Sequence, residues 1–440
     1  MTLFRDLVQG RHLTSHRAFS VQFQRAAEDL AERVGDPRLA SLDVSPRQFD
    51  RWMGGEIKSL PQPDACRVLE HMLGQPAADL FQRPGSQSVP VSPASPAVAA
   101  TELPASACGD DPLEIVARAR QLTTSNADPP TIAFLRTSLE RISGRYEQEG
   151  PQGLHGQTAD LRTLLHTLLD GHQPPRVRQD LFHLTARASG LLAYMAVNTG
   201  HFTLAEAYCV EAQELSRVIG DLHTELWVNG TRSFSLYYAG RYAEADACAA
   251  AAVERSPQAA QAIRLLVNGR ARALGKLGDR KAADRAIGQA LDLTARHDVP
   301  AGLTPCMSFQ PYGQARTLAN AITAHVSLGN ADQALRSAEQ IDDMIEHSDS
   351  AWSRSLVRLD VATALLHQRS PDIEHALRLG KEALGLCGGK PIRSVWQRSR
   401  DLHAWARRWP DRAAVREYGD ELRLWSSQPA ALAMSAAGTR

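Results

Sequence analysis

The sequence contains fragments of catalytic and metal-binding motifs, but none is complete. Gly275-Lys276 and Gly389-Lys390 resemble the end of a phosphate-binding loop, yet both lack the upstream glycine of G-x-x-x-x-G-K-[ST]. Neither the serine-nucleophile pattern G-x-S-x-G nor the zinc pattern H-E-x-x-H occurs. His12 and His16 have the spacing of two metal ligands on one helical face, but no third ligand lies nearby. We therefore expect no enzymatic activity, no cofactor and no metal site.

The composition is typical of a folded protein, and its balanced charge does not favour a strongly charged partner. The 440 residues contain 49 lysines and arginines and 49 aspartates and glutamates, so net charge gives no argument for a nucleic-acid partner. The six cysteines are widely spaced and form no C-x-x-C pair, which fits reduced thiols. Neither a signal peptide nor an apolar stretch of about 18 residues is present. We expect a cytoplasmic protein that does not enter a membrane.

One segment, residues 82–111, separates two regions of different size. It is rich in proline, serine and alanine and contains no aromatic residue. Such a composition cannot bury enough apolar surface to offset the entropy that is lost on ordering. We predict a flexible linker between a head, residues 1–81, and a body, residues 112–440.

The body repeats one pattern of small residues. Gly200, Gly240, Gly278 and Gly329 are each followed by an alanine five positions later, and Pro371 begins a degenerate fifth copy. The glycine can end a helix in the left-handed conformation, and the alanine lets two antiparallel helices approach closely. These copies resemble the second helix of tetratricopeptide repeats, although their spacing exceeds the roughly 34 residues of that family. The resemblance implies an all-α, solenoid-like body; a generic helical bundle is the alternative.

Further helices are predicted on both sides of the repeats. Apolar periodicity indicates helices over residues 131–148, 154–170 and 176–198 before them. Residues 391–408 and 411–425 indicate a terminal pair with four tryptophans, which would cap the stack of repeats.

In tetratricopeptide repeats the first helix of each pair lines the concave face, so the resemblance places a groove there. Counting back from each marker glycine gives aromatic, asparagine and arginine side chains. These are Arg187, Tyr194, Asn198, Trp227, Phe234, Tyr238, Asn268, Arg272, Arg316 and Asn320, with Lys276, Thr323 and Arg358 further along. Asparagine can bond a peptide backbone and arginine a carboxylate. We expect a peptide, small-molecule or protein ligand, unless Trp227, Phe234 and Tyr238 merely pack between helices.

The head is predicted to contain five short helices, over residues 20–34, 37–42, 46–53, 63–73 and 76–81. Ser45 is expected to cap the third helix, with proline at its first position. Phe49 and Trp52 would face the core. The motifs are V-S at 44–45, R-W at 51–52, Gly54-Gly55, Pro61, L-G at 73–74 and L-F at 80–81.

This order of motifs resembles the five-helix, helix-turn-helix domain of the Cro/repressor (XRE) superfamily. Met53 stands where that family usually has glutamate, and Asp43 where it usually has glycine. Together with the repeats, the head resembles the helix-turn-helix–tetratricopeptide regulators of actinobacteria. That resemblance implies transcriptional control.

The resemblance also assigns roles to residues of the head. Arg47, Gln48 and Arg51 would read base edges of double-stranded operator DNA from the recognition helix, and Ser45 and Lys58 would hold phosphates. Such proteins usually bind two half-sites, so we expect a homodimer joined through the body. Residues 1–85 contain 11 basic and 11 acidic residues, however. The alternative is therefore a tetratricopeptide adaptor whose head no longer binds DNA.

Overall fold

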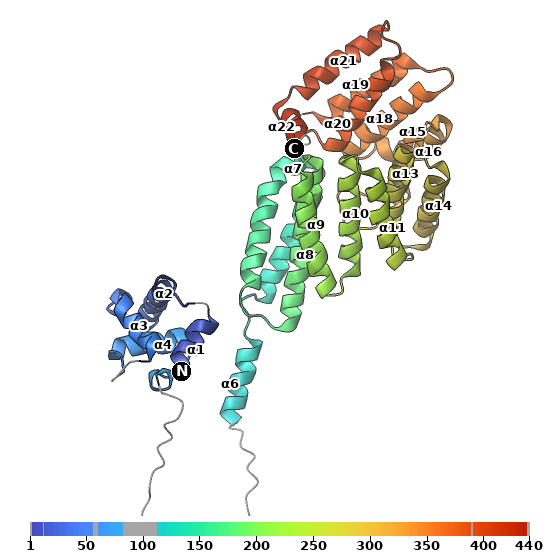
Figure 1. Ribbon diagram of the computed structural model, residues 1–440. Coiled ribbons are helices and arrows are strands. Elements are labelled where there is room, and N and C mark those ends of the chain that lie inside the picture. The colour runs from blue at the N-terminus through green and yellow to red at the C-terminus, as the bar shows by residue number, and fades with distance from the viewer. Residues whose placement is uncertain (1, 12, 56–59, 82–111, 389, 438–440) are drawn as a thin grey trace, which may run out of the picture. The chain divides into compact units, whose positions relative to one another are not determined.

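The computed structural model describes residues 2–11, 13–55, 60–81, 112–388 and 390–437 (Figure 1). Every element in these ranges is a helix, and none is a strand, which confirms the all-α class. The chain divides into two units, Met1–Ala107 and Cys108–Arg440. The predicted linker, residues 82–111, lies outside the described residues. Across the described ranges, no helix has both the length and the apolar character that crossing a lipid bilayer requires.

The first unit is built around a core of aromatic side chains. Its elements are α1 (Leu3–Gly10), α2 (His16–Val34), the 3-10 turn η1 (Leu39–Ser41), α3 (Pro46–Gly54), α4 (Pro63–Leu73) and α5 (Ala77–Leu80). The ring of Phe4 lies 5.8 Å from that of Phe19, 5.9 Å from that of Trp52 and 5.0 Å from that of Phe81. Phe4 and Val8 are the only buried apolar residues of α1. Two such residues are too few to show a helical periodicity in the sequence, so this helix was not predicted.

Two elements of the head differ from the prediction. Helix α2 begins at His16, earlier than expected, because the Ser15 hydroxyl accepts a hydrogen bond from the Ala18 backbone N–H (3.2 Å). The helix predicted over residues 37–42 is only the single turn η1. The Asp36 carboxylate accepts from the Arg38 backbone N–H (3.2 Å), and this local bond favours a turn over a helix.

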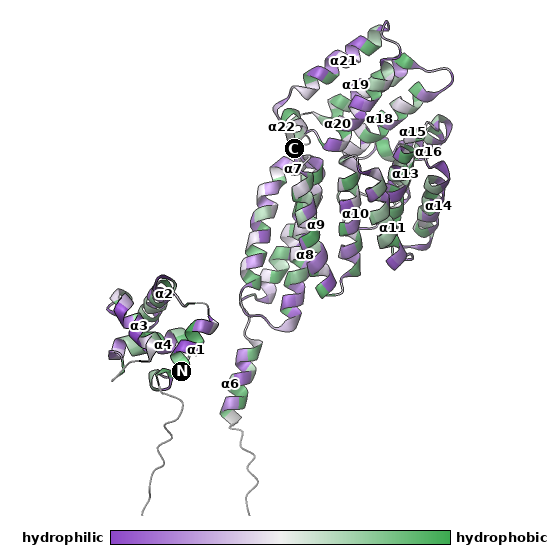
Figure 2. Cartoon of the chain, viewed as in Figure 1, coloured by the Kyte–Doolittle hydropathy of each residue, from purple (hydrophilic) through white to green (hydrophobic). Residues whose placement is uncertain are grey.

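The second unit is a series of helices that pack on their neighbours along the chain (Figure 1). They are α6 (Pro112–Thr123), α7 (Pro129–Leu169), α8 (Pro175–Asn198), α9 (Phe202–Val218), α10 (Leu222–Tyr238), α11 (Tyr242–Arg255), α12 (Ala262–Arg264), the π-helical segment η2 (Leu265–Ala271), α13 (Arg272–Leu277), α14 (Arg280–Arg296), α15 (Gln314–Ser327), α16 (Ala331–Glu339), α17 (Asp342–Glu346), α18 (Ala351–His367), α19 (Ile373–Cys387), α20 (Arg393–Ala406), α21 (Ala413–Ser426) and α22 (Pro429–Ala437). Hydrophobic and hydrophilic residues mix along most of these helices (Figure 2), as amphipathic packing requires.

The repeated glycines and alanines behave as predicted. The four marker glycines have φ values from 68° to 84°, the left-handed conformation that glycine adopts most easily. The alanines five positions after them are fully buried between antiparallel helices; they are Ala205, Ala245, Ala283 and Ala334. Gly150 also has a positive φ of 81° and is non-helical, so it divides α7 into two helical halves, which correspond to the two helices predicted over residues 131–148 and 154–170.

The two ends of the body meet. Helix α20 packs against α8, and Lys390 donates a hydrogen bond to the Gln148 carbonyl. The ring of Tyr146 in α7 lies 5.4 Å from that of Trp352 in α18. The series therefore closes on itself, whereas the terminal pair was predicted to cap an open stack. Of the four tryptophans of that pair, Trp425 is buried, and Trp396, Trp405 and Trp409 are half-buried.

Candidate ligand chamber and DNA-contacting helix

The concave side of the body encloses a small chamber between α7, α8, α10, η2, α13, α15, α18 and α20. Its lining residues are Tyr146, Tyr194, Asn198, Phe234, Tyr238, Asn268, Arg272, Cys306, Tyr312, Arg316, Ala319, Asn320, Trp352, Ser353, Leu356, Val357, Ile392, Ser394 and Arg398. The chamber has a volume of about 50 Å³, which is room for a few water molecules. The chamber is partly open to solvent.

Eight of the ten predicted groove residues line this chamber. They are Tyr194, Asn198, Phe234, Tyr238, Asn268, Arg272, Arg316 and Asn320. Five helical elements carry them, namely α8, α10, η2, α13 and α15, so their convergence depends on the stacking of the repeats. The marker glycines locate these residues correctly because each glycine fixes where the preceding helix ends.

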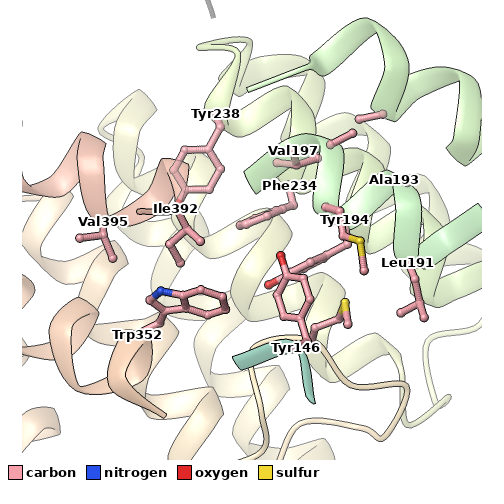
Figure 3. Close-up of a cluster of buried hydrophobic side chains, with 14 of the residues drawn as sticks. Tyr146, Leu191, Ala193, Tyr194, Val197, Phe234, Tyr238, Trp352, Ile392 and Val395 are labelled. Atoms are coloured by element: carbon pink, nitrogen blue, oxygen red, sulfur yellow. The ribbon is translucent and has the colours of Figure 1, made fainter. Parts of the chain in front are cut away.

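Aromatic rings form one side of the chamber (Figure 3). The rings of Tyr194 and Phe234 are stacked, with centroids 5.2 Å apart and an interplanar angle of 7°. Tyr238 meets Phe234 edge-on at 4.8 Å, and Tyr146 meets Tyr194 at 5.8 Å. These rings are buried or nearly so, so they pack between helices and line the chamber at the same time.

Two buried arginines face the rings. Arg272 is 3% exposed, and its Nη1 and Nη2 donate to Asn268 Oδ1 (2.5 Å) and the Tyr238 hydroxyl (2.7 Å). Arg316 is 5% exposed, and its Nε and Nη2 donate to the Thr304 carbonyl (2.7 Å) and the Ser353 hydroxyl (2.7 Å). All four acceptors are neutral.

Neighbouring rings keep Arg272 charged. Its guanidinium lies 4.3 Å from the centre of the Tyr237 ring, a cation–π contact. Burial acts to lower the pKa of Arg272, but Tyr238 and Tyr237 raise it on balance. The guanidinium is therefore a permanent positive charge inside the chamber.

A segment of the chain itself covers the remaining part of the concave face. The Trp227 indole donates to the Ser308 carbonyl (2.6 Å), and the Tyr194 hydroxyl donates to the Cys306 carbonyl (2.9 Å). The Phe309 ring lies 4.5 Å from the Trp227 ring. The proline- and glycine-containing segment that precedes α15 is thus bound through its backbone carbonyls by tyrosine and tryptophan side chains.

This segment explains why two predicted groove residues do not line the chamber. Trp227 lies beneath Phe309, and the Arg187 guanidinium lies 4.8 Å from the centre of the same ring. Burial lowers the pKa of Arg187. Trp227 is buried beneath the segment, whereas Arg187 is half-buried and lines a separate pocket of about 340 Å³ beside Ser308 and Phe309.

A larger pocket of about 230 Å³ adjoins the chamber and shares Tyr238, Arg272 and Arg398 with it. Lys276 and Thr323 line this second pocket, while Arg358 pairs with Glu346 on the surface (2.8 Å). Asp360 also lines it; burial raises the pKa of this carboxyl, although Arg398 and Thr323 act against the rise.

In the head, α3 presents the predicted DNA-contacting residues. The Ser45 hydroxyl caps α3 by accepting from the Gln48 backbone N–H (3.3 Å). Phe49 and Trp52 are buried on one face, while Arg47 and Arg51 are exposed on the other and Gln48 is half-buried.

Arg47 and Arg51 have no ionic partner among the described residues of the head. Neither side chain makes a hydrogen bond or ion pair with any described residue. Lys58, the predicted phosphate contact, lies outside the described residues. Both arginines are exposed on the face of α3 opposite Phe49 and Trp52.

Several chamber residues were not predicted from the sequence. Tyr146, Trp352 and Arg398 come from helices α7, α18 and α20. None of these helices is followed by one of the four marker glycines, so counting back from a glycine does not reach them. The tryptophan and tyrosine could be predicted as core residues by periodicity, but only the closure of the body brings them to the chamber.

Neither the models of known protein families nor the sequences of curated proteins match this chain. Within the described ranges, no group of three or more histidine, cysteine, aspartate or glutamate side chains could hold a metal ion. The argument for function therefore depends on the geometry of the chamber and of α3.

Proposed function

We propose that the protein is a cytoplasmic, DNA-binding transcriptional regulator. Its head would be a repressor-type helix-turn-helix domain that binds double-stranded operator DNA, and its body a tetratricopeptide-like α-solenoid that binds a ligand. The observation that carries this proposal is the pair of exposed arginines on α3, Arg47 and Arg51, which have no partner among the described residues and lie opposite a face buried through Phe49 and Trp52.

The residues of α3 suit base readout. Arginine bonds O6 and N7 of guanine with two hydrogen bonds, and the Gln48 amide can bond N6 and N7 of adenine. The N-terminal part of a recognition helix is the part that contacts base edges, and Ser45, Arg47 and Gln48 lie there.

The even charge of the head favours two copies on one operator. Residues 1–85 contain 11 basic and 11 acidic residues, so a single head would gain little from phosphate contacts. Two heads on a homodimer would contact two half-sites about one helical turn apart, and the second contact would benefit from a high effective concentration.

The body supplies the ligand-binding half of the proposal. Its chamber collects aromatic, asparagine and arginine side chains from helices that lie far apart in the sequence. The backbone of residues 306–309 is already bound by Tyr194, Trp227 and Gln261, so this face can hold an extended chain. The small volume of the chamber favours a small molecule or a short peptide end over a whole protein.

DNA capture from a genomic library with the intact protein, followed by gel shifts, tests the proposal. We expect Arg47→Ala and Arg51→Ala each to weaken operator binding by about 1–3 kcal/mol, because each removes a two-bond base contact. Arg33→Ala is the matched control, because it removes the same charge from an exposed position of α2. Unchanged affinity in both α3 variants, or an equal loss in the control, contradicts the proposal.

The second candidate is an adaptor whose head contacts only protein. The equal number of acidic and basic residues in the head favours it. Failure of the intact protein to enrich any DNA, together with a folded head, would support this alternative.

A further inference from the structure

We propose that the chamber binds the oxyanion group, a carboxylate or a phosphate, of a small ligand, and that Arg272 and Arg316 hold it. The inference rests on the ligand-binding role proposed above for the body and names the chemistry of the ligand. It starts from charges that the described residues leave without a counter-ion.

The chamber lining contains three guanidinium groups and no carboxylate. Arg398 has a partner outside the lining, because its Nε lies 3.3 Å from Asp360 Oδ1. Arg272 and Arg316 form no ion pair with a described residue and donate only to neutral oxygens. A buried charge without a counter-ion is costly, so an anion in the chamber would be favoured.

Other elements packed around the chamber do not supply the missing charge. Glu147 of α7 accepts a hydrogen bond from the Cys306 backbone N–H and forms no ion pair with either arginine within the described ranges. Asp360 serves Arg398 and accepts from the Thr323 hydroxyl (2.7 Å). Asp360 acts electrostatically on Arg272, and Glu147 on Arg316, but neither carboxylate lines the chamber or pairs with these arginines, so the lining itself holds no acidic side chain to balance them.

Unused hydrogen-bonding groups point to the same place. Arg272 Nε is buried and has no hydrogen-bond partner. Asn198 donates to the Tyr146 hydroxyl (2.7 Å), but its Oδ1 is buried without a partner; turning the amide over would leave its nitrogen unpaired instead. Buried polar groups are normally satisfied, and a bound ligand would satisfy these.

The local backbone around Arg272 is also unusual. Asn268 lies within the π-helical segment η2, and Arg272 is the first residue after that segment. Short π-helical segments occur frequently at functional sites. This one brings two polar side chains of a single helix into the chamber.

The available space limits the ligand. The chamber, at about 50 Å³, has room for the oxyanion head alone, while the adjoining pocket of about 230 Å³ could take the remainder. In that pocket Asp360 pairs with Arg398 (3.3 Å) and Asp401 with Lys276 (3.3 Å), so both carboxylates already have a cationic partner. The remainder of the ligand should therefore be neutral.

Calorimetric titration of the full-length protein with inorganic phosphate and, separately, with benzoate tests the proposal. Trp352 lines the chamber, so its fluorescence offers a second readout. We expect saturable binding of at least one probe, and the better probe identifies the phosphate or carboxylate source. Arg272→Gln and Arg316→Gln should each weaken binding about tenfold or more, the usual effect of removing a hydrogen bond to a charged group.

Two further variants keep the test decisive. Arg393→Gln removes a half-buried arginine stacked on Trp396, outside the chamber, and should leave binding unchanged. Asn320→Asp keeps every arginine but places a carboxylate in the lining, and should abolish binding even if Arg272→Gln does not fold.

The inference is overturned if neither probe binds saturably, or if Arg316→Gln and Asn320→Asp bind as the wild type does. In that case the arginines serve only to pack the helices. Gel shifts with the same preparations separate this result from failure of the proposed function, because DNA binding depends on the head and not on the chamber.

Discussion

Individual charged residues hold the helices of the body together by pairing across them. Glu225 of α10 is 6% exposed and lies 2.6 Å from Arg217 of α9 and 2.7 Å from Arg255, the last residue of α11. One carboxylate thus joins three helices, which satisfies the charge that it buries. Arg272 and Arg316 differ from this rule, and that difference is what makes the chamber a candidate site.

The His183–Asp221 pair predicts a pH dependence of stability. The two side chains lie 2.5 Å apart, and Asp221 also caps α10 by accepting from the Thr224 backbone N–H (3.0 Å). Burial acts to raise the pKa of Asp221, but the hydrogen bonds from His183 and Thr224 lower it on balance. The folded pKa thus lies below the unfolded value of about 3.9, so the stabilisation is complete above that pH and is lost as pH falls further.

We expect Asp221→Asn to lower the free energy of unfolding by about 1 kcal/mol at neutral pH, because it removes a charged hydrogen bond but keeps the cap. The difference from wild type should shrink toward pH 3 in urea denaturation. Asp292→Asn, at an exposed position of α14, is the control and should have little effect. A deficit in Asp221→Asn that is the same at both pH values would contradict the assigned pKa shift.

Local helix geometry explains which chamber residues could be predicted from the sequence. The position six residues before a marker glycine gives Tyr194, Phe234 and Arg272, and all three line the chamber. Helical periodicity sets the face on which such residues lie. The unpaired state of Arg272 could not be predicted, because it depends on which acidic residues of other helices come near.

At the scale of elements, the helix ends are the features that the sequence determines best. Gly240 has a φ of 79° and no atom near the position of a Cβ, so its conformation, not its size, is required. We expect Gly240→Ala to destabilise the body by about 1 kcal/mol, the cost of the left-handed region for a residue with a side chain.

Gly288 provides the matched control for that substitution. It lies exposed within α14 with nothing within 4 Å of its Cβ position, and alanine there should stabilise the helix by about 0.5–1 kcal/mol. Chemical denaturation of both variants measures the two changes. Equal effects of the same sign would show that the left-handed cap at Gly240 is unimportant.

Irregular elements were predicted less well, for a physical reason. The segment bound by Trp227 and Tyr194 has no periodic pattern, and its conformation depends on side chains that donate to its carbonyls from α8 and α10. The single turn η1 is likewise set by a local side-chain bond at Asp36. In both cases specific hydrogen bonds, rather than apolar spacing, decide the structure.

At the scale of the whole body, the contacts of α7 and α8 with α18 and α20 could not be predicted. The contact between Tyr146 and Trp352 joins residues of α7 and α18, and repeat patterns report only on neighbouring helices. In an open solenoid each repeat contacts only its neighbours, so stability is approximately a sum of local terms. A closed body should instead couple its two ends.

Trp352→Ala tests this coupling. The side chain is 2% exposed, and its indole N–H donates to the Lys390 carbonyl (3.0 Å), so its removal should cost about 3–5 kcal/mol through the cavity that it leaves. Because Trp352 contacts α7 as well as its own neighbours, amide hydrogen exchange should accelerate in α7 and α8 together with α18 and α19. Phe134→Ala, at a 64% exposed position of α7, should change neither the free energy of unfolding nor the rate of amide hydrogen exchange. Faster exchange confined to α18 and α19 would mean that the body behaves as an open array.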